Sequence, residues 1–153
     1  MTFKSINPLN GEVIATFEED PHYFLKIRKA EITYNQWRET SIEQRVRLML
    51  NLAEILETRK LELAKEISLE MGKTLKSATA EIEKCVVTTR FYCKIAGEQL
   101  NNVEVDNYAY KAYHRYEPQG GILAVMPWNF PYWQALRFAI PTILAGNVVL
   151  LKH

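Results

Sequence analysis

Apolar residues recur every three or four positions through most of the first hundred residues, and this spacing is typical of amphipathic helices. One such pattern follows Asp20 and Pro21, a pair that favours the start of a helix. A second opens with Ser41 and Gln44, which match a capping box, the reciprocal side-chain caps of a helix start. The side chains expected to face the core from these two helices are Ile27, Ala30, Tyr34, Trp37, Val46, Met49, Leu50, Ala53 and Leu56.

Two further helical patterns complete this half of the chain. After a break expected between Thr58 and Lys60, one continues to Gly72, because glycine readily adopts the left-handed conformation that ends a helix. The other runs from about Thr79 to Leu100. The apolar stripe of the first comprises Leu61, Ala64, Ile67 and Met71. The charged flank of the second, interpreted as a solvent-facing surface, comprises Glu81, Glu83, Lys84, Arg90 and Lys94.

Antiparallel strands are predicted in two places. Near the N-terminus, Asn10 and Gly11 separate two short apolar runs and predict a hairpin with a tight turn. From Val103, the segment "VEVDNYAYKAYHRYEP" alternates with a period of two and predicts a two-stranded ribbon. One side would carry Tyr108, Tyr110, Ala112, His114 and Tyr116, and the other Lys111, Tyr113 and Arg115. Because such a ribbon is marginally stable alone, we expect it to contact another subunit of a homo-oligomer.

A parallel sheet is predicted near the C-terminus. The segments 121–126 and 147–152 are continuous apolar runs, typical of strands covered on both faces. The residues between them are enough for one helix. Strand, crossover helix and strand form the first βαβ unit of a parallel sheet, in which ligands bind at the carboxyl ends of the strands. Asn129 falls just beyond the first of these ends.

Composition narrows the class of protein. The chain has 153 residues, of which 48% are hydrophobic and 24% charged, as in an ordinary globular domain. Its 19 Lys and Arg residues nearly balance 18 Asp and Glu residues, and no basic cluster predicts binding to nucleic acid. In the apolar segment 121–151, Pro127, Pro131 and Pro141 interrupt any run long enough for a membrane span. We therefore interpret this segment as buried core.

The cysteines and the N-terminus bear on the compartment. Cys85 and Cys93 have neither the spacing of a disulfide framework nor that of a metal site, so no metal is expected. Both lie in a helical pattern without a neighbouring His that could activate a thiol, and we interpret them as small core residues. The first residues lack the apolar core of a signal peptide. A reducing cytoplasm fits these features best.

Three polar or aromatic side chains give the apolar segment its candidate chemistry. If a helix begins near Pro131, then Asn129, Trp133 and Arg137 are spaced by four and lie near one face. An amide beside the positive end of a helix suits an oxyanion hole, and a guanidinium can bind a carboxylate through two hydrogen bonds. Ordinary structural roles remain open: Asn129 as a helix cap, Trp133 as core packing and Arg137 in an ion pair.

The segment "MPWNFPYWQALRFAIPTILAGNVVLLKH" resembles the corresponding part of the aldehyde dehydrogenase superfamily, and most closely its succinate-semialdehyde dehydrogenases. The likeness extends to "NPLNGEVI", "LEMGKTLKSATAEI" and "YEPQGGILAVMPWNFP", so it covers nearly the whole chain. It implies an α/β fold with an N-terminal helical layer (1–101), an oligomerisation β-ribbon (102–118) and the start of a Rossmann-like sheet that binds NAD or NADP (119–153).

The resemblance also implies roles for single residues. The activity would be oxidation of a small aldehyde to a carboxylic acid through a cysteine thiohemiacetal. Asn129 matches the oxyanion-stabilising amide, and Arg137 the residue that binds the substrate carboxylate, with Trp133 beside it. Lys152 matches a lysine that bonds to the adenosine ribose. The strand end that runs beside the cofactor is matched by Val125, Met126 and Trp128.

The chain departs from the family pattern in its length. It stops at His153, before the positions at which the family carries its nucleophilic cysteine and its general-base glutamate, so we expect the isolated chain to be inactive. The alternative hypothesis is a non-catalytic assembly module that associates through the ribbon and the sheet edge. A weaker hypothesis is membrane attachment through residues 121–151.

Overall fold

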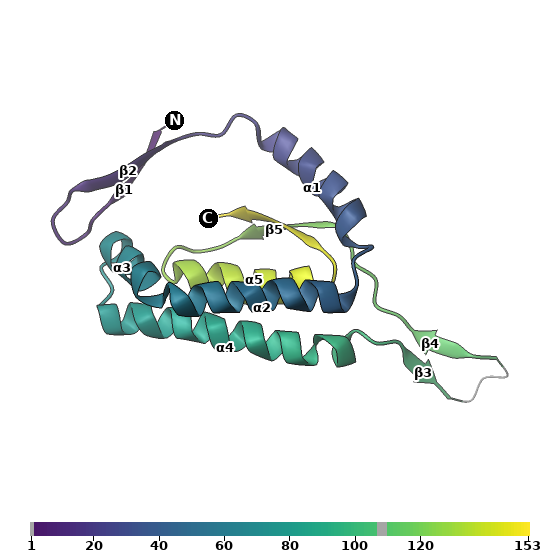
Figure 1. The fold of residues 1–153 in the computed structure, drawn as a ribbon. Helices are drawn as coiled ribbons and strands as arrows, with labels where there is room; N and C mark the ends of the chain where they lie inside the picture. The colour runs from purple at the N-terminus through teal and green to yellow at the C-terminus, as the bar shows by residue number, and fades with distance from the viewer. Residues whose placement is uncertain (1, 107–109) are drawn as a thin grey trace.

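Residues 2–106 and 110–153 are described by the computed structural model, in which a layer of helices packs against a two-stranded parallel sheet (Figure 1). Helix α1 contacts both strands of this sheet, and α5 packs between the sheet and the remaining helices. In chain order the elements are β1 (Thr2–Ile6), β2 (Val13–Glu18), α1 (Tyr23–Trp37), α2 (Ile42–Thr58), α3 (Lys60–Met71), α4 (Leu75–Gln99), β3 (Val103–Val105), β4 (Ala112–His114), β5 (Gly121–Val125), α5 (Pro131–Leu144) and β6 (Val148–Lys152).

The core lies where the long helix α4 meets α2, α3 and α5. Its largest fully buried side chains include Ile67, Ile82 and Ile140, one from each of three helices. The expected apolar stripes of α2 and α3 are confirmed except at two positions. Leu50 is 41% exposed and Leu61 is 60% exposed, because both lie outside the strip that neighbouring helices cover.

Helix α1 begins later than its sequence predicts. Its first residue is Tyr23, and the carboxylate of Asp20 accepts a hydrogen bond from the amide of His22 at 2.8 Å, which stabilises a turn that precedes the helix. Ala30 is buried against the sheet, but Ile27 is 50% exposed. The N-terminal half of α1 therefore contributes less to the core than its periodicity suggests.

Local signals place the start of α2 and the end of α3 correctly, but not the start of α4. The capping box is present, since the side chain of Ser41 accepts from the amide of Gln44 and that of Gln44 accepts from the amide of Ser41. Gly72 has φ = 68° and ends α3 in the left-handed conformation. Helix α4 starts at Leu75, earlier than predicted, because the hydroxyl of Thr74 caps it.

The predicted βαβ unit is confirmed. Strands β5 and β6 pair in parallel, from Gly121 opposite Val148 to Val125 opposite Lys152, and α5 connects them. The prediction that both faces of the sheet are fully covered is wrong. The side chains of Leu123 and Val125 are each 66% exposed. They lie on the same face of β5 as Gly121, where α1 packs. One face of β5 is therefore open toward its carboxyl end.

Both antiparallel hairpins form. Strands β1 and β2 pair antiparallel, from Thr2 opposite Glu18 to Ile6 opposite Val13. The connection between them, residues 7–12, is wider than the predicted two-residue turn, and Gly11 in it has φ = 74°. Strands β3 and β4 form the predicted ribbon, which projects from the helical layer (Figure 1). The exposed fractions of Tyr110, Tyr113 and Tyr116 are 88%, 53% and 59%, whereas Tyr108 lies outside the described residues.

The apolar segment between the two parallel strands forms a short helix. Helix α5 has 14 residues and contains Pro141 within it. Across residues 2–106 and 110–153, no helix has the length and hydropathy needed to cross a membrane. Within the same ranges, no group of three His, Cys, Asp or Glu side chains could hold a metal ion.

Candidate functional site

A buried carboxylate from α4 holds the start of helix α5. Oε1 of Glu81 accepts hydrogen bonds from the backbone amides of Tyr132 and Trp133, each at 3.1 Å. Its other oxygen, Oε2, accepts from Nζ of Lys73 at 2.5 Å. The Glu81 side chain is 1% exposed, so these contacts replace the water that a buried charge loses. The prediction that Glu81 belongs to a solvent-facing flank is therefore wrong.

The first turn of α5 explains why a charged side chain is buried there. The first amides of a helix lack acceptors within the helix and carry a partial positive charge, which favours a neighbouring anion. Glu81 satisfies two of these amides, and Lys73 balances its charge while lying 3.5 Å from the centre of the Phe130 ring. The other members of the predicted flank are exposed: Glu83, Lys84, Arg90 and Lys94.

Asn129 lies in an exposed turn just beyond the end of β5, where the sequence predicts it. It does not cap α5, because the N-cap position belongs to Phe130 and no side chain at that position bonds to the helix. Within the described part of the chain, no hydrogen bond is recorded for the Asn129 amide. The capping interpretation is therefore wrong, since Glu81 takes the amides that a cap would use.

The residues that the sequence predicts to contact the cofactor lie at the carboxyl ends of the two parallel strands. Val125 pairs with Lys152, and the amide of Met126 donates to the carbonyl oxygen of Lys152 at 3.0 Å. Trp128 follows in the turn and is 70% exposed. The structure thus brings these four residues to one edge of the sheet, the edge at which ligands bind in parallel α/β folds.

Two adjoining hollows lie along the contact between α4 and α5, and Trp133 lines both. One has a volume of about 420 Å³ and includes Lys84 and Gln134 in its lining, and the other has about 390 Å³ and includes Arg137. Nζ of Lys84 lies 3.9 Å from the centre of the Trp133 ring. Asn129 lines neither of these hollows, so the structure brings Trp133 and Arg137 together but places the amide elsewhere.

The sequence context of Arg137 suggested that it is enclosed in apolar surroundings, but the residue is exposed. Its guanidinium forms no ion pair or hydrogen bond with any described residue. The alternative hypothesis, that Arg137 forms an ion pair within the chain, is therefore wrong for the described residues. An unpaired guanidinium at the mouth of a hollow is free to bind an anion.

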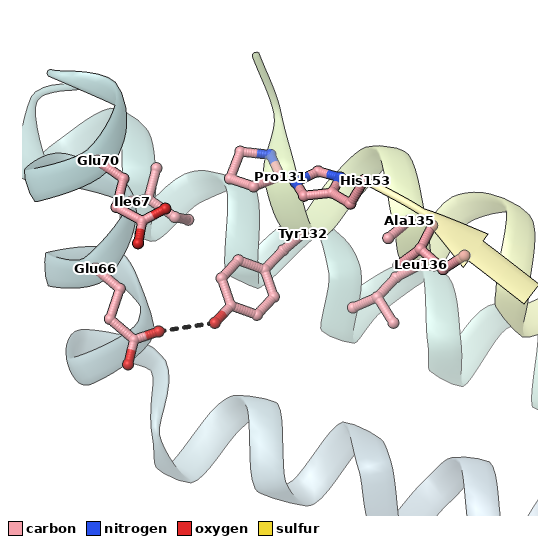
Figure 2. A pocket seen from close by; sticks show the side chains of 9 residues that line it. Glu66, Ile67, Glu70, Pro131, Tyr132, Ala135, Leu136 and His153 are labelled. Carbon is pink, nitrogen blue, oxygen red and sulfur yellow. Dashed lines mark hydrogen bonds between the residues drawn. The ribbon is translucent and has the colours of Figure 1, made fainter. Parts of the chain in front are cut away.

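A third hollow, of about 350 Å³, lies between α3 and α5 and was not foreseen from the sequence (Figure 2). Glu66 and Glu70 stand at its rim, and the hydroxyl of Tyr132 donates to Glu66 at 2.8 Å. Burial and this bond raise the pKa of Tyr132. The spacing of the two glutamates by one helical turn is the signal that marks this acidic rim. Such a rim disfavours a carboxylate or a phosphate.

Both cysteines are core residues, as predicted. Cys85 is fully buried in the main core, and burial, with a smaller effect from the charge of Glu81, raises the pKa of its thiol to about 12. Cys93 is 7% exposed, and burial raises its pKa as well. Because a nucleophilic cysteine must be a thiolate, neither residue is suited to attack a substrate.

A sequence profile of the aldehyde dehydrogenase family matches residues 1–153, and the chain belongs to that family. The probable NADP(+) succinate-semialdehyde dehydrogenase of Synechocystis sp. is 42% identical over 155 residues, which cover 100% of this chain and 34% of that protein. NADP(+) succinate-semialdehyde dehydrogenase 1 of Mycobacterium tuberculosis H37Rv is 44% identical over 158 residues, covering 100% of this chain and 35% of the relative. The chain spans about a third of the length of these curated relatives.

Solved structures of the family have the same fold over this region. The crystal structure of succinic semialdehyde dehydrogenase from Streptococcus pyogenes in complex with NADP+ matches with a TM-score of 0.92 and 30% identity, over 99% of this chain and 34% of that one. A structure of Gox0499 matches with a TM-score of 0.95 and 33% identity, over 100% and 34% of the two chains. The predicted α/β fold class, with its helical layer, ribbon and first βαβ unit, is confirmed.

Replacing Glu81 with Ala is expected to lower the free energy of unfolding by about 3 to 5 kcal/mol, because the change leaves two helix amides and the Lys73 ammonium without their acceptor. Glu81→Gln keeps one acceptor oxygen and should lose less. Urea unfolding followed by circular dichroism measures both. The effects of Glu81→Ala and Lys73→Met should also be non-additive, because the two side chains form one contact.

Glu83 provides the matched control, because it lies on the same helix and pairs with Lys60 at 2.9 Å but is 52% exposed. Glu83→Gln is expected to leave the urea midpoint almost unchanged, since exposed ion pairs contribute little to stability. Equal losses at positions 81 and 83 would show that Glu81 does not hold α5.

In the folded chain at pH 8, Ellman's reagent is expected to label no thiol within minutes, because a thiol with a pKa of about 12 at Cys85 is almost entirely protonated there. In urea both thiols should react. Since the folded state holds this proton more tightly, stability should fall as the pH rises above the ordinary thiol pKa of about 8.5. Rapid labelling of the native chain would contradict the assignment of the cysteines to the core.

Proposed function

We propose that the chain forms part of an enzyme that oxidises succinate semialdehyde, or a similar aldehyde, to the carboxylic acid with NADP(+) or NAD(+). The observation that carries this proposal is the guanidinium of Arg137, which has no ion-pair partner among the described residues and lines a hollow beside Trp133, eight residues after Asn129. The names of the Synechocystis and mycobacterial relatives support the same substrate class.

The proposed roles follow from the chemistry of the side chains. The Asn129 amide donates to the aldehyde oxygen, which becomes negative when a nucleophile adds to the carbonyl carbon. The backbone amides of Tyr132 and Trp133 already donate to Glu81. The side-chain amide of Asn129 is therefore the donor available to the aldehyde oxygen. Arg137 binds the substrate carboxylate through its planar pair of N–H groups, and Trp133 forms an apolar wall beside it.

The edge of the parallel sheet suits a nicotinamide dinucleotide. When bound, the cofactor supplies the acceptor for the hydride that leaves the substrate. The exposed ammonium of Lys152 offers donors for ribose hydroxyls, and the exposed side chains of Val125 and Trp128 offer apolar surface for the rings. Met126 joins the two strand ends through its bond to Lys152.

The reaction also requires an activated thiol and a general base. Cys85 and Cys93 are excluded from the first role by their burial and their raised pKa values. We therefore expect residues 1–153, purified by themselves, to show no turnover of succinate semialdehyde.

A chimera tests the proposed function directly. Residues 1–153 replace the matching segment of the Synechocystis relative, which aligns with 100% of this chain. The chimera is expected to oxidise succinate semialdehyde with NADP(+), measured as NADPH absorbance. Asn129→Ala should lower kcat by about 10²- to 10³-fold, the usual cost of losing one oxyanion donor. Arg137→Met should mainly raise KM for succinate semialdehyde.

The control is Asn51→Ala, which removes an exposed amide from α2, away from the sheet edge and the hollows. It should leave both kinetic constants unchanged. A folded chimera that binds NADP(+) but is inactive, or one whose kcat is insensitive to Asn129→Ala, would contradict the proposed function.

A second candidate function is assembly, which the exposed tyrosines of the projecting ribbon favour. We propose that the ribbon formed by β3 and β4 contacts another copy of the chain in a homo-oligomer. A two-stranded ribbon gains little stability alone, and tyrosine rings gain free energy when another surface covers them.

Sedimentation velocity tests the assembly hypothesis. The chain is expected to form a dimer or larger species at micromolar concentration, and the double variant Tyr113→Ser, Tyr116→Ser should shift it toward the monomer. Tyr23→Ser, which removes a ring that is 54% exposed on α1, is the matched control and should not change the distribution. A monomeric wild-type chain would rule out the assembly hypothesis.

A further inference from the structure

Two cations, Lys84 and Arg137, lie on the walls of the hollows between α4 and α5. The ammonium of Lys84 rests over the ring of Trp133, and Arg137 follows Trp133 by one turn of α5. For neither cation does the described part of the chain provide a carboxylate partner. Four cations elsewhere on the helical layer do have carboxylate partners, namely Arg59, Lys60, Lys73 and Arg90.

Each cation lines one of two hollows that share Trp133, and we call these two hollows together the α4–α5 groove. Lys84 lines the hollow of about 420 Å³, Arg137 lines that of about 390 Å³, and Trp133 lines both. Thr88 follows Lys84 by one turn of α4 and lines the second hollow, just as Arg137 follows Trp133 on α5. Each of the two helices therefore contributes residues from two successive turns to the α4–α5 groove.

The charge of this groove is positive although an acidic residue lines it. Glu81 lines the first hollow, but its oxygens accept from Lys73 and from two amides of α5. Its charge is therefore balanced within the fold. Gln134 lines the same hollow, and its buried Oε1 has no hydrogen-bond partner. The groove thus combines two free cations with an acceptor that a hydroxyl could satisfy.

We propose that Lys84 and Arg137 together bind the carboxylate of the substrate beside the Trp133 ring, and that Lys84 is a specificity-determining residue. Resting on the proposed function, this inference adds a second cation to its substrate site. Arg137 offers two parallel N–H donors and Lys84 a compact charge, and a carboxylate can accept from both kinds of donor. Aldehydes that lack a carboxylate would leave both cations unpaired.

A stable analogue of the substrate tests the proposal without turnover. 4-Hydroxybutyrate carries the carboxylate of succinate semialdehyde and a hydroxyl in place of its aldehyde. Titrated into the isotope-labelled chain, it should shift the NMR signal of the Trp133 indole N–H saturably, with little change at Trp37. 1,4-Butanediol, the analogue without a carboxylate, should cause no shift. Trp→Phe variants assign the three indole signals.

Single substitutions separate the two cations. Lys84→Met and Arg137→Met should each weaken the binding of 4-hydroxybutyrate about tenfold, equal to about 1.4 kcal/mol. The double variant should show no saturable shift. Lys94→Met, which removes another exposed lysine from α4, is the control and should retain the full affinity. All three positions are exposed, so circular dichroism should show folded variants.

Two results would overturn the proposal. One is unchanged affinity in Lys84→Met while Arg137→Met loses binding, which assigns the carboxylate to Arg137 alone. The other is an indole shift of equal size with 1,4-butanediol, which shows that charge does not drive binding. Neither result affects the activity of the chimera, so this inference and the proposed function fail separately.

Discussion

The contact between Glu81 and the start of α5 organises this structure. One carboxylate, contributed by α4, accepts from two amides of α5 and from Lys73, which lies in the connection between α3 and α4. Three segments thereby meet at one buried charge. Its desolvation is offset by direct bonds to all of its partners, which makes the position of α5 highly specific. The turn that carries Asn129 precedes this anchored end.

Helix α5 separates two surfaces of opposite charge. On the side of α3 the hollow has Glu66 and Glu70 at its rim, whereas on the side of α4 the groove carries Lys84 and Arg137. The charge of Glu81 does not reduce this difference, because Lys73 and two backbone amides of α5 balance it within the fold. A carboxylate would thus meet favourable charge along one side of α5 and unfavourable charge along the other.

Exposed apolar side chains also lie at the margins of the helical layer. The outer face of β5 exposes Leu123 and Val125 beside the strand ends, and the ribbon exposes its tyrosines. These side chains contribute little to the core of this chain. The chain matches about a third of the length of its curated relatives, and its own core is nevertheless formed by its own helices.

Sequence alone determined the features that depend on neighbouring residues. Ser41 caps a helix, Gly72 ends one and two apolar runs frame a crossover helix, because caps, left-handed glycines and strand periodicity act within a few positions. The resemblance named the family. Tertiary structure decided the rest. Periodicity put Glu81 on a solvent-facing flank, and residue type made Asn129 a candidate cap. The burial of a carboxylate, however, depends on which distant amides need an acceptor, and here α5 supplies them.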